Sequence, residues 1–190
     1  MRVRGERLVQ RVGEVITHAP SERCGVDVTG EIERLERQLR TAFKGPAWHG
    51  PALREVLRDV DAARAAARPI STAHTIWEIV LHLGAMYQLV RRRLLGDGTP
   101  LSAEEDWPEV PEPTQENWQA AVAALAAHNA ALSAAVRSFD PSRLAMPLVA
   151  EPPHSAFEQF IGLTQHDLYH AGQIVLLARA QTSGGRSSVP

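Results

Sequence analysis

The sequence predicts an all-α protein, organised as a four-helix bundle with an extra N-terminal segment. Four long stretches repeat apolar residues three and four positions apart, which places those residues on one face of a helix. The alternation of apolar and polar residues that is typical of half-buried strands is nearly absent. At 190 residues, the chain has the length of one domain with its own core.

The first two long helices are delimited by capping residues and by glycines. Thr29 can accept a backbone hydrogen bond at the start of the first helix, which Gly45-Pro46 then ends. The second helix is expected to begin at Ser71 or Thr72, which have the same capping chemistry, and to end before Gly96. Each helix carries a continuous apolar face, so each has one side to bury.

The third and fourth long helices have equally clear boundaries. An alanine-rich stretch begins at Thr114 and is stopped by Asp140-Pro141, because proline cannot continue a helix. Ser155 is followed three residues later by Glu158, which is the pattern of a capping box, and no helix-breaking residue follows before Gly184. Together with the first two, these helices complete the predicted bundle.

The remaining segments connect or extend the four helices. Because proline suits the first helical turn, a shorter helix is expected to begin at Pro51. It carries apolar residues up to Val60 and is expected to end by Arg68-Pro69. The stretch Thr99–Pro113 contains four prolines and is predicted to be a long, non-helical crossover. We expect residues 1–28 to form an extension with a short helix at most, residues 29–182 to form the bundle, and residues 183–190 to form a flexible tail.

Composition and charge narrow the classes of function. The chain carries 20 basic and 22 acidic residues, a formal net charge of −2, so no overall positive field attracts nucleic acid or an anionic membrane. No stretch approaches the roughly 20 consecutive apolar residues that span a bilayer. The one cysteine, Cys24, cannot form an internal disulfide, which suits a reducing compartment. We expect a cytoplasmic protein that binds neither nucleic acid nor membranes.

The most specific motif is HDLYH, His166 to His170, in the fourth helix. Histidines four positions apart lie one turn apart on the same helical face, roughly 5 to 6 Å between Cβ atoms, so both can reach one metal ion. The motif differs from the HExxH pattern of zinc proteases, because Asp167 stands where a glutamate would act as general base. Asp167 points about 100° away from His166 around the helix, which favours a supporting or solvent-exposed role.

His82 is the best candidate for a third ligand. It lies among apolar residues in the second long helix, where an imidazole without a partner would cost about 1 to 3 kcal/mol. A metal held with His166 and His170 would supply that partner, and so would an ordinary hydrogen bond in the core. Periodicity does not choose between these alternatives, and a core with three ordinary histidines stays open at this point.

Other residues are candidates for lining such a site. Gln173 follows His170 by three positions and Glu78 precedes His82 by four, so each shares a helical face with a candidate ligand. His49 lies in a loop rich in proline and glycine that can fold over the bundle, although packing on a neighbouring tryptophan explains it equally well. Arg91–Arg93 form a solvated helix end that can also attract an anion. The sequence suggests no role for His18, His128 and His154.

Three segments resemble the DinB and YfiT-like family of metalloproteins: TIWEIVLHLGAMYQLV around His82, HDLYHAGQIVLLARA around His166 and His170, and GPAWHGPALREVL before them. The resemblance runs from about Glu31 to Ala180. It implies a four-helix bundle of up-down-down-up order. It also implies a divalent metal, nickel or zinc above all, bound by one histidine of the second helix and two of the last.

The resemblance leaves the activity open, because the family includes S-transferases that use low-molecular-weight thiols, hydrolases and isomerase relatives. We expect a metal-dependent enzyme in which a metal-bound thiol or water attacks a small electrophilic substrate. The alternative is a non-catalytic, stress-associated bundle that binds metal. The apolar spacing of residues 8 to 16 also suggests a surface for pairing, and hence a homodimer.

Overall fold

The computed structural model describes residues 28–48 and 50–183, and these residues form helices joined by loops. The predicted all-α class is confirmed, with only an isolated bridge between Pro147 and Ser155 in the described residues. The predictions for Cys24, His49, the chain before residue 28 and the tail after residue 183 lie outside this part. The helices are α1 (Val28–Lys44), α2 (Leu53–Val56), α3 (Ala62–Ala66), α4 (Ile76–Leu94), α5 (Ala103–Asp106), α6 (Gln115–Arg137), the 3₁₀ helix η1 (Pro141–Arg143) and α7 (Ala156–Ser183).

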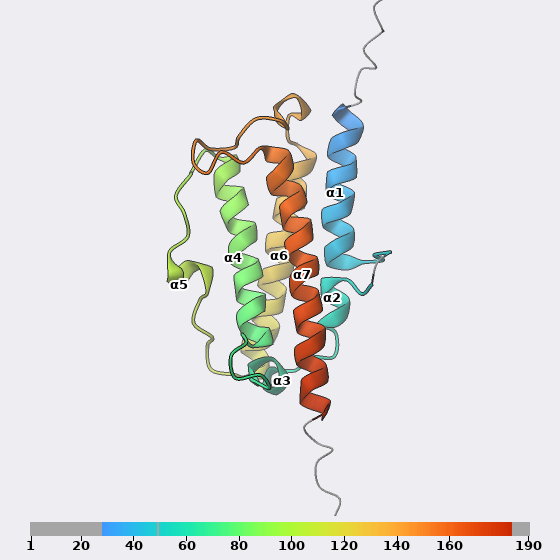
Figure 1. Cartoon of the computed structure of the whole chain (residues 1–190), viewed down its shortest axis with the longest axis vertical. Coiled ribbons are helices and arrows are strands. Elements are labelled where there is room, and N and C mark those ends of the chain that lie inside the picture. The colour runs from blue at the N-terminus through green and yellow to red at the C-terminus, as the bar shows by residue number, and fades with distance from the viewer. Residues whose placement is uncertain (1–27, 49, 184–190) are drawn as a thin grey trace, which may run out of the picture.

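The four long helices lie side by side as a bundle (Figure 1). α1 packs against α6 and α7, and α4 packs against the same two helices, so α1 and α4 occupy opposite corners. In the view of Figure 1, α1 and α7 run downward while α4 and α6 run upward. The short helices cover the outside: α2 lies against α1 and α7, α3 against α4 and α6, and α5 against α4.

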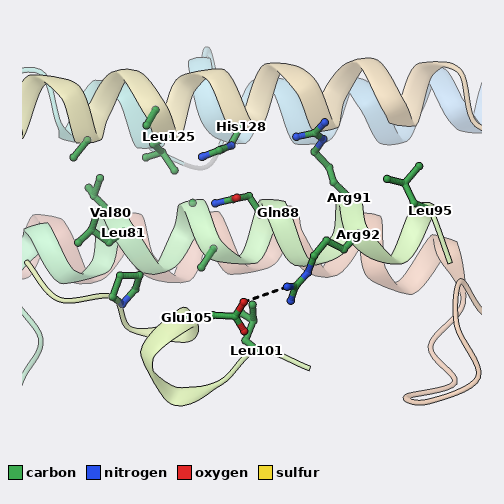
Figure 2. Close-up of a pocket in the computed structure, with 15 residues that line it drawn as sticks. Val80, Leu81, Gln88, Arg91, Arg92, Leu95, Leu101, Glu105, Leu125 and His128 are labelled. Carbon is green, nitrogen blue, oxygen red and sulfur yellow. Dashed lines mark hydrogen bonds and ion pairs between the residues drawn. The ribbon is translucent and has the colours of Figure 1, made fainter. Parts of the chain in front are cut away.

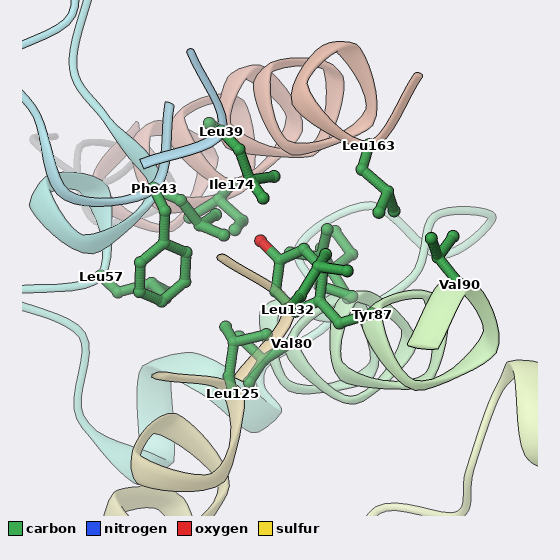
Figure 3. Close-up of a cluster of buried hydrophobic side chains, with 14 of the residues drawn as sticks. Leu39, Phe43, Leu57, Val80, Tyr87, Val90, Leu125, Leu132, Leu163 and Ile174 are labelled. Atoms are coloured by element: carbon green, nitrogen blue, oxygen red, sulfur yellow. The ribbon is translucent and has the colours of Figure 1, made fainter. Parts of the chain in front are cut away.

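All four long helices contribute side chains to one buried apolar core. Burying a leucine, isoleucine or phenylalanine side chain contributes about 1.5–3 kcal/mol, so this core is the main source of stability. Figure 3 shows its centre, where residues from different helices meet. The residues there include Leu39 and Phe43 of α1, Val80 and Tyr87 of α4, Leu125 and Leu132 of α6, and Ile174 of α7.

α1 ends at Gly45, as the sequence predicted. Gly45 has a φ of 82°, in the left-handed region that favours glycine after the last helical turn. A Cβ atom at this position would lie 2.9 Å from Oε1 of Glu55, so a larger residue would also collide with that side chain. Glu55 in turn accepts a 2.7 Å hydrogen bond from the backbone N–H of Ala52, at the start of α2.

α4 begins later than the sequence predicted. The capping residue is Thr75, and the expectation of Ser71 or Thr72 was wrong, because both of these lie exposed in the preceding turn. Thr75 Oγ1 accepts a 3.1 Å hydrogen bond from the N–H of Glu78, and the Glu78 carboxylate accepts one of 2.6 Å from the N–H of Thr75. This reciprocal pair is a capping box, which neither Ser71 nor Thr72 can form with an acid three residues later.

The single helix predicted from Pro51 to about Arg68 is instead two separate short helices. α2 ends at Val56, and Asp61 then caps α3 by accepting a 2.8 Å hydrogen bond from the N–H of Arg64. The Val60 carbonyl between them accepts a 2.6 Å hydrogen bond from the buried indole N–H of Trp118 on α6. This long-range bond occupies a carbonyl that a continuous helix would use internally, so the segment breaks there.

The boundaries predicted for the last two long helices are confirmed. Thr114 caps α6 by accepting a 3.2 Å hydrogen bond from the N–H of Asn117, and Ser155 with Glu158 forms the predicted capping contacts at the start of α7. Within the described chain, α6 is long and apolar enough, by composition, to cross a membrane. Helices inside soluble proteins pass the same test, and α6 packs here against α1 and α4.

We predict that Thr75→Ala lowers the free energy of unfolding by about 1 kcal/mol, because it leaves a helix N–H without its side-chain acceptor. Thr72→Ala is the matched control and should leave the stability unchanged, since Thr72 lies exposed in the turn before the helix. Urea unfolding of both variants, monitored by circular dichroism in the presence of a chelator, measures the difference. Equal losses in the two variants would contradict the assignment of the cap.

Candidate metal centre

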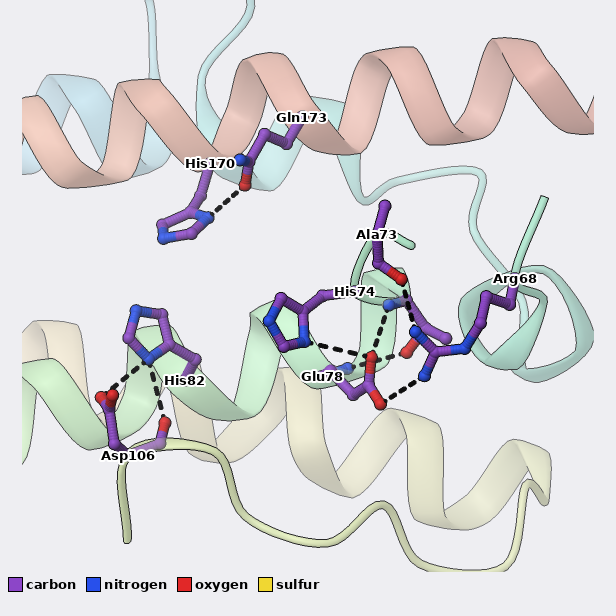
Figure 4. A network of polar contacts seen from close by, with 9 residues as sticks. Arg68, Ala73, His74, Glu78, His82, Asp106, His170 and Gln173 are labelled. Atoms are coloured by element: carbon purple, nitrogen blue, oxygen red, sulfur yellow. Dashed lines mark hydrogen bonds and ion pairs between the residues drawn. The ribbon is translucent and has the colours of Figure 1, made fainter. Parts of the chain in front are cut away.

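The packing of α4 on α7 brings three imidazoles together. Nε2 of His166 lies 3.1 Å from Nε2 of His82 and 3.0 Å from Nε2 of His170. All three ligand atoms lie within 4.8 Å of one another, and these residues form the one group of potential metal ligands found in the described chain. Figure 4 shows His82 and His170 facing each other between the two helices. The fold therefore brings together three histidines whose spacing in the sequence only allowed a shared metal site.

His82 is oriented by the segment that contains α5. Its Nδ1 lies 2.9 Å from the backbone oxygen of Asp106 and 3.0 Å from that residue's carboxylate Oδ1. Both partners are acceptors, so Nδ1 carries the hydrogen and Nε2 presents its lone pair to the cluster. The His82 ring also stacks on Trp107, with 4.1 Å between centroids, and Trp107 stacks on His74 at 3.6 Å.

His170 is oriented in the same way by Gln173. Its Nδ1 donates a 2.6 Å hydrogen bond to Gln173 Oε1, and its Nε2 therefore also presents a lone pair to the cluster (Figure 4). Nδ1 of His166 is buried and has no hydrogen-bond partner in the described chain. A hydrogen on His166 Nε2 can satisfy only one of the two neighbouring lone pairs. One divalent cation at the centre satisfies all three nitrogens together.

The electrostatic surroundings keep the His166 and His170 imidazoles neutral. Burial, followed by the neighbouring His170 and His82, lowers the pKa of His166 to about 4. Burial also lowers the pKa of His170 to about 4, against a smaller opposing effect of the hydrogen bond to Gln173. Protonation of His166 and His170 is therefore unfavourable at neutral pH. A neutral imidazole is the form that binds a metal ion.

The dimensions of the cluster also suit a metal. Zinc binds histidine nitrogens at about 2.1 Å, and a tetrahedral arrangement then separates two such nitrogens by about 3.4 Å. The separations of 3.0 and 3.1 Å around His166 require only a slight opening of the rings to reach that value. The donor type, the direction of the lone pairs and the spacing all fit a divalent ion.

Glu78 occupies a different place from the one expected. Its carboxylate accepts the capping bond from Thr75, pairs with Arg68 at 2.6 Å and lies 3.5 Å from Nδ1 of His74 (Figure 4). These contacts lie at the start of α4, and they reach His82 only indirectly, through His74 and the ring of Trp107. Glu78 shares a helical face with His82, but its carboxylate is held at the N-terminus of α4 by the backbone N–H of Thr75.

Asp167 does not face the solvent, and the expectation of a solvent-exposed role is wrong. The residue is fully buried, and the Tyr87 hydroxyl of α4 donates its hydrogen to the carboxyl group, with its oxygen 2.6 and 2.7 Å from the two carboxyl oxygens. Burial raises the pKa of Asp167 to about 8, although the Tyr87 hydrogen bond acts in the opposite direction. Asp167 is therefore protonated at neutral pH and joins α7 to α4 inside the core.

Sequence reasoning missed Asp106 and Trp107. Both lie in the proline-rich crossover, which we expected to be only a connection and which contains the four-residue helix α5. Ser102 and Glu105 form a capping box there, a local pattern that was readable in the sequence. The contact with His82 was not readable, because it spans 24 positions along the chain and depends on how the crossover folds back onto α4.

The sequence model of the DinB superfamily matches residues 47–174, about two thirds of the chain, and all three histidines lie in that range. The chain belongs to the DinB superfamily. The resemblance that the His82 and His166 segments suggested is thereby confirmed. No curated protein and no solved structure gave a significant match to this DinB-superfamily chain. The site is therefore interpreted from its own geometry.

We predict that two substitutions of Asp167 in this DinB-superfamily protein differ in their effect on stability. At pH 5, Asp167→Asn should preserve most of the stability, because the native group is already uncharged. Asp167→Ala should cost about 1–3 kcal/mol, because it leaves the buried Tyr87 hydroxyl without the acceptor of its hydrogen.

The change of stability with pH provides a second test of the protonated Asp167. A carboxyl whose pKa is higher in the folded protein contributes stability that is complete below the unfolded pKa of about 3.9. That contribution declines as the pH rises toward the folded pKa of about 8. Asp167→Asn should therefore gain stability relative to the wild type between pH 5 and pH 8, with no further gain above. Urea unfolding in the presence of a chelator, repeated from pH 5 to pH 8, measures the free energy of unfolding of both proteins. If the two free energies changed with pH in parallel, Asp167 would not be protonated in the folded protein.

Proposed function

We propose that this protein is a metal-dependent enzyme whose three histidines hold a divalent ion, nickel or zinc, for thiol transfer to small electrophiles or for their hydrolysis. The observation that carries the proposal is the convergence of three Nε2 atoms whose rings are held from behind. Asp106 and Gln173 fix two of the rings with their lone pairs inward. Membership of the DinB superfamily and the three-histidine cluster support the metal-binding part.

The number of ligands favours an activating ion. Structural zinc sites are closed by four protein ligands, whereas catalytic sites use three and leave a position for a small molecule. The group found in the described chain has three members. His82 and His170 are buried while His166 is half-buried, so the cluster is most accessible beside His166. We infer that a thiol or water reaches the site from that side.

The surrounding side chains have defined tasks in this proposal. A bound divalent ion lowers the pKa of a thiol or water and so supplies a nucleophile at neutral pH. Asp106 and Gln173 hold the His82 and His170 rings in the tautomer that binds the ion. Trp107 covers the His82 ring and keeps water from it. Tyr169, edge-on to His170 and 64% exposed, offers an aromatic surface to the substrate.

Elemental analysis of the untagged protein is the primary experiment. We expect about one nickel or zinc ion per chain after reconstitution, because a three-histidine site binds a single ion. The triple variant His82→Ala, His166→Ala, His170→Ala should bind none. His154→Ala is the matched control and should retain the metal, since His154 lies exposed at the loop before α7. Failure of the reconstituted wild type to bind metal would refute the proposal.

Turnover separates catalysis from metal binding alone. The loaded protein is assayed with a small thiol and 1-chloro-2,4-dinitrobenzene for transfer, and with p-nitrophenyl acetate for hydrolysis. We expect one of these rates to fall to the background in the triple variant and after chelation. Full metal occupancy without turnover on either class of substrate would favour the alternative, a metal-binding bundle without catalysis.

We predict that Asp106→Ala weakens metal binding about tenfold. Loss of a partner behind a metal-binding histidine costs about 10 to 100-fold in affinity, and the backbone oxygen at residue 106 still contacts His82. Glu104→Ala is the matched control on α5, because Glu104 is exposed and should leave the affinity unchanged. Competition against a chromophoric chelator measures both affinities. A wild-type affinity in Asp106→Ala would exclude a positioning role for this carboxylate.

A further inference from the structure

A cavity of about 410 Å³ lies between α4, α6 and the crossover that contains α5 (Figure 2). Its size is within the range of small-molecule sites, about 300–1,000 Å³. The Arg91 end of the cavity is turned away from the histidine cluster, because Arg91 is nine residues beyond His82 on α4. At about 100° per residue, this places Arg91 on the opposite side of α4. None of the three clustered histidines lines it.

The cavity is apolar at one end and basic at the other. Figure 2 shows Val80, Leu81 and Leu125 together at one end, and Arg91 and Arg92 toward the other. Between these ends, Gln88 of α4 faces His128 of α6. An apolar floor with a basic end suits a molecule that is itself apolar at one end and anionic at the other.

Several polar groups in the cavity wall have unused hydrogen-bonding capacity. In the described part of the chain, the side chains of Gln88, Arg91 and His128 make no hydrogen bond to protein, and Nε of Arg92 is buried without a partner. Burial, with Arg91 nearby, lowers the pKa of His128, so its imidazole is neutral at pH 7 and can donate one hydrogen bond. A ligand with several acceptor oxygens would satisfy these donors.

The charges in the wall indicate how many negative charges the ligand carries. Glu105 is the acidic residue lining the cavity, and its carboxylate already pairs with Arg92 at 3.2 Å and accepts the capping bond from the Ser102 N–H. Arg91 is therefore the positive charge left without an acidic partner among the lining residues. One unpaired guanidinium balances a monoanion, and its planar donors match the two oxygens of a carboxylate.

We propose that this cavity binds a small monocarboxylate with an aliphatic or aromatic body. The carboxylate lies against Arg91, Gln88 and His128, and the apolar body lies along Leu81 and Leu125. This binding site is independent of the metal centre, so it neither requires a bound ion nor depends on the function proposed above. It gives the protein a second ligand, held on the other face of the helix that carries His82.

Isothermal titration of the full chain with decanoate tests this site. Saturable binding of one decanoate per chain is expected, with equal affinity in the metal-loaded protein and in the His82→Ala, His166→Ala, His170→Ala variant. Decanol lacks the carboxylate and decyltrimethylammonium has the opposite charge, so both should bind at least about tenfold more weakly. Binding of decanoate that needs the three histidines would assign the carboxylate to the metal centre and overturn the proposal.

Variants of the cavity wall provide the second arm of the test. Arg91→Gln should weaken decanoate binding about tenfold or more, whereas Arg58→Gln, at an exposed arginine away from the cavity, should have no effect. Ala124→Phe fills the cavity from α6 without changing any charge and should also abolish binding. Thermal unfolding shows that each variant is folded. Wild-type affinity in Arg91→Gln or Ala124→Phe, or the absence of saturable binding in the wild type, would overturn the proposal.

Discussion

The buried hydrogen bond between Tyr87 and Asp167 sets the register of α4 against α7, and the metal centre depends on that register. Asp167 directly follows His166, and Tyr87 lies little more than one turn beyond His82, so the same pair of helices carries both contacts. A slide of one helix along the other by a single residue would move the ligands by about 1.5 Å and separate the converging nitrogens. A protonated carboxyl serves here better than an ionised one, because burial of a charge without a cationic partner would oppose the packing.

The sequence predicted the parts of this structure that follow from local chemistry. Apolar periodicity located the four long helices, and capping residues located the starts of α6 and α7. The spacing of His166 and His170 placed two imidazoles on one face of α7. The prediction from sequence failed where more than one residue could begin a helix, or where a distant contact interrupts one. Thr72 and Thr75 both have capping chemistry, and only the acid at position 78 distinguishes them. The split between α2 and α3 depends on a tryptophan 58 positions away, which periodicity does not reveal.

The crossover is the part that local reasoning described least well. Its prolines correctly indicated a long connection, but its path over α4 depends on tertiary contacts. Glu105 and Asp106 are adjacent in the chain and serve different partners, Arg92 for the first and His82 for the second. Trp107 then stacks on His82. A segment without long regular structure thus supplies contacts to both the histidine cluster and the cavity, as loops on a rigid scaffold often do.

The metal ligands and part of their surroundings therefore come from different parts of the fold. The ligands stand on two long helices whose packing the whole core enforces. The residues that contact the His82 ring, Asp106 and Trp107, come instead from a connection at the edge of that core. Connections of this kind accept changes of length and composition far more readily than packed helices. Descendants of this chain can therefore acquire a new chemical environment around the same three nitrogens by exchanging one loop, with the bundle left intact.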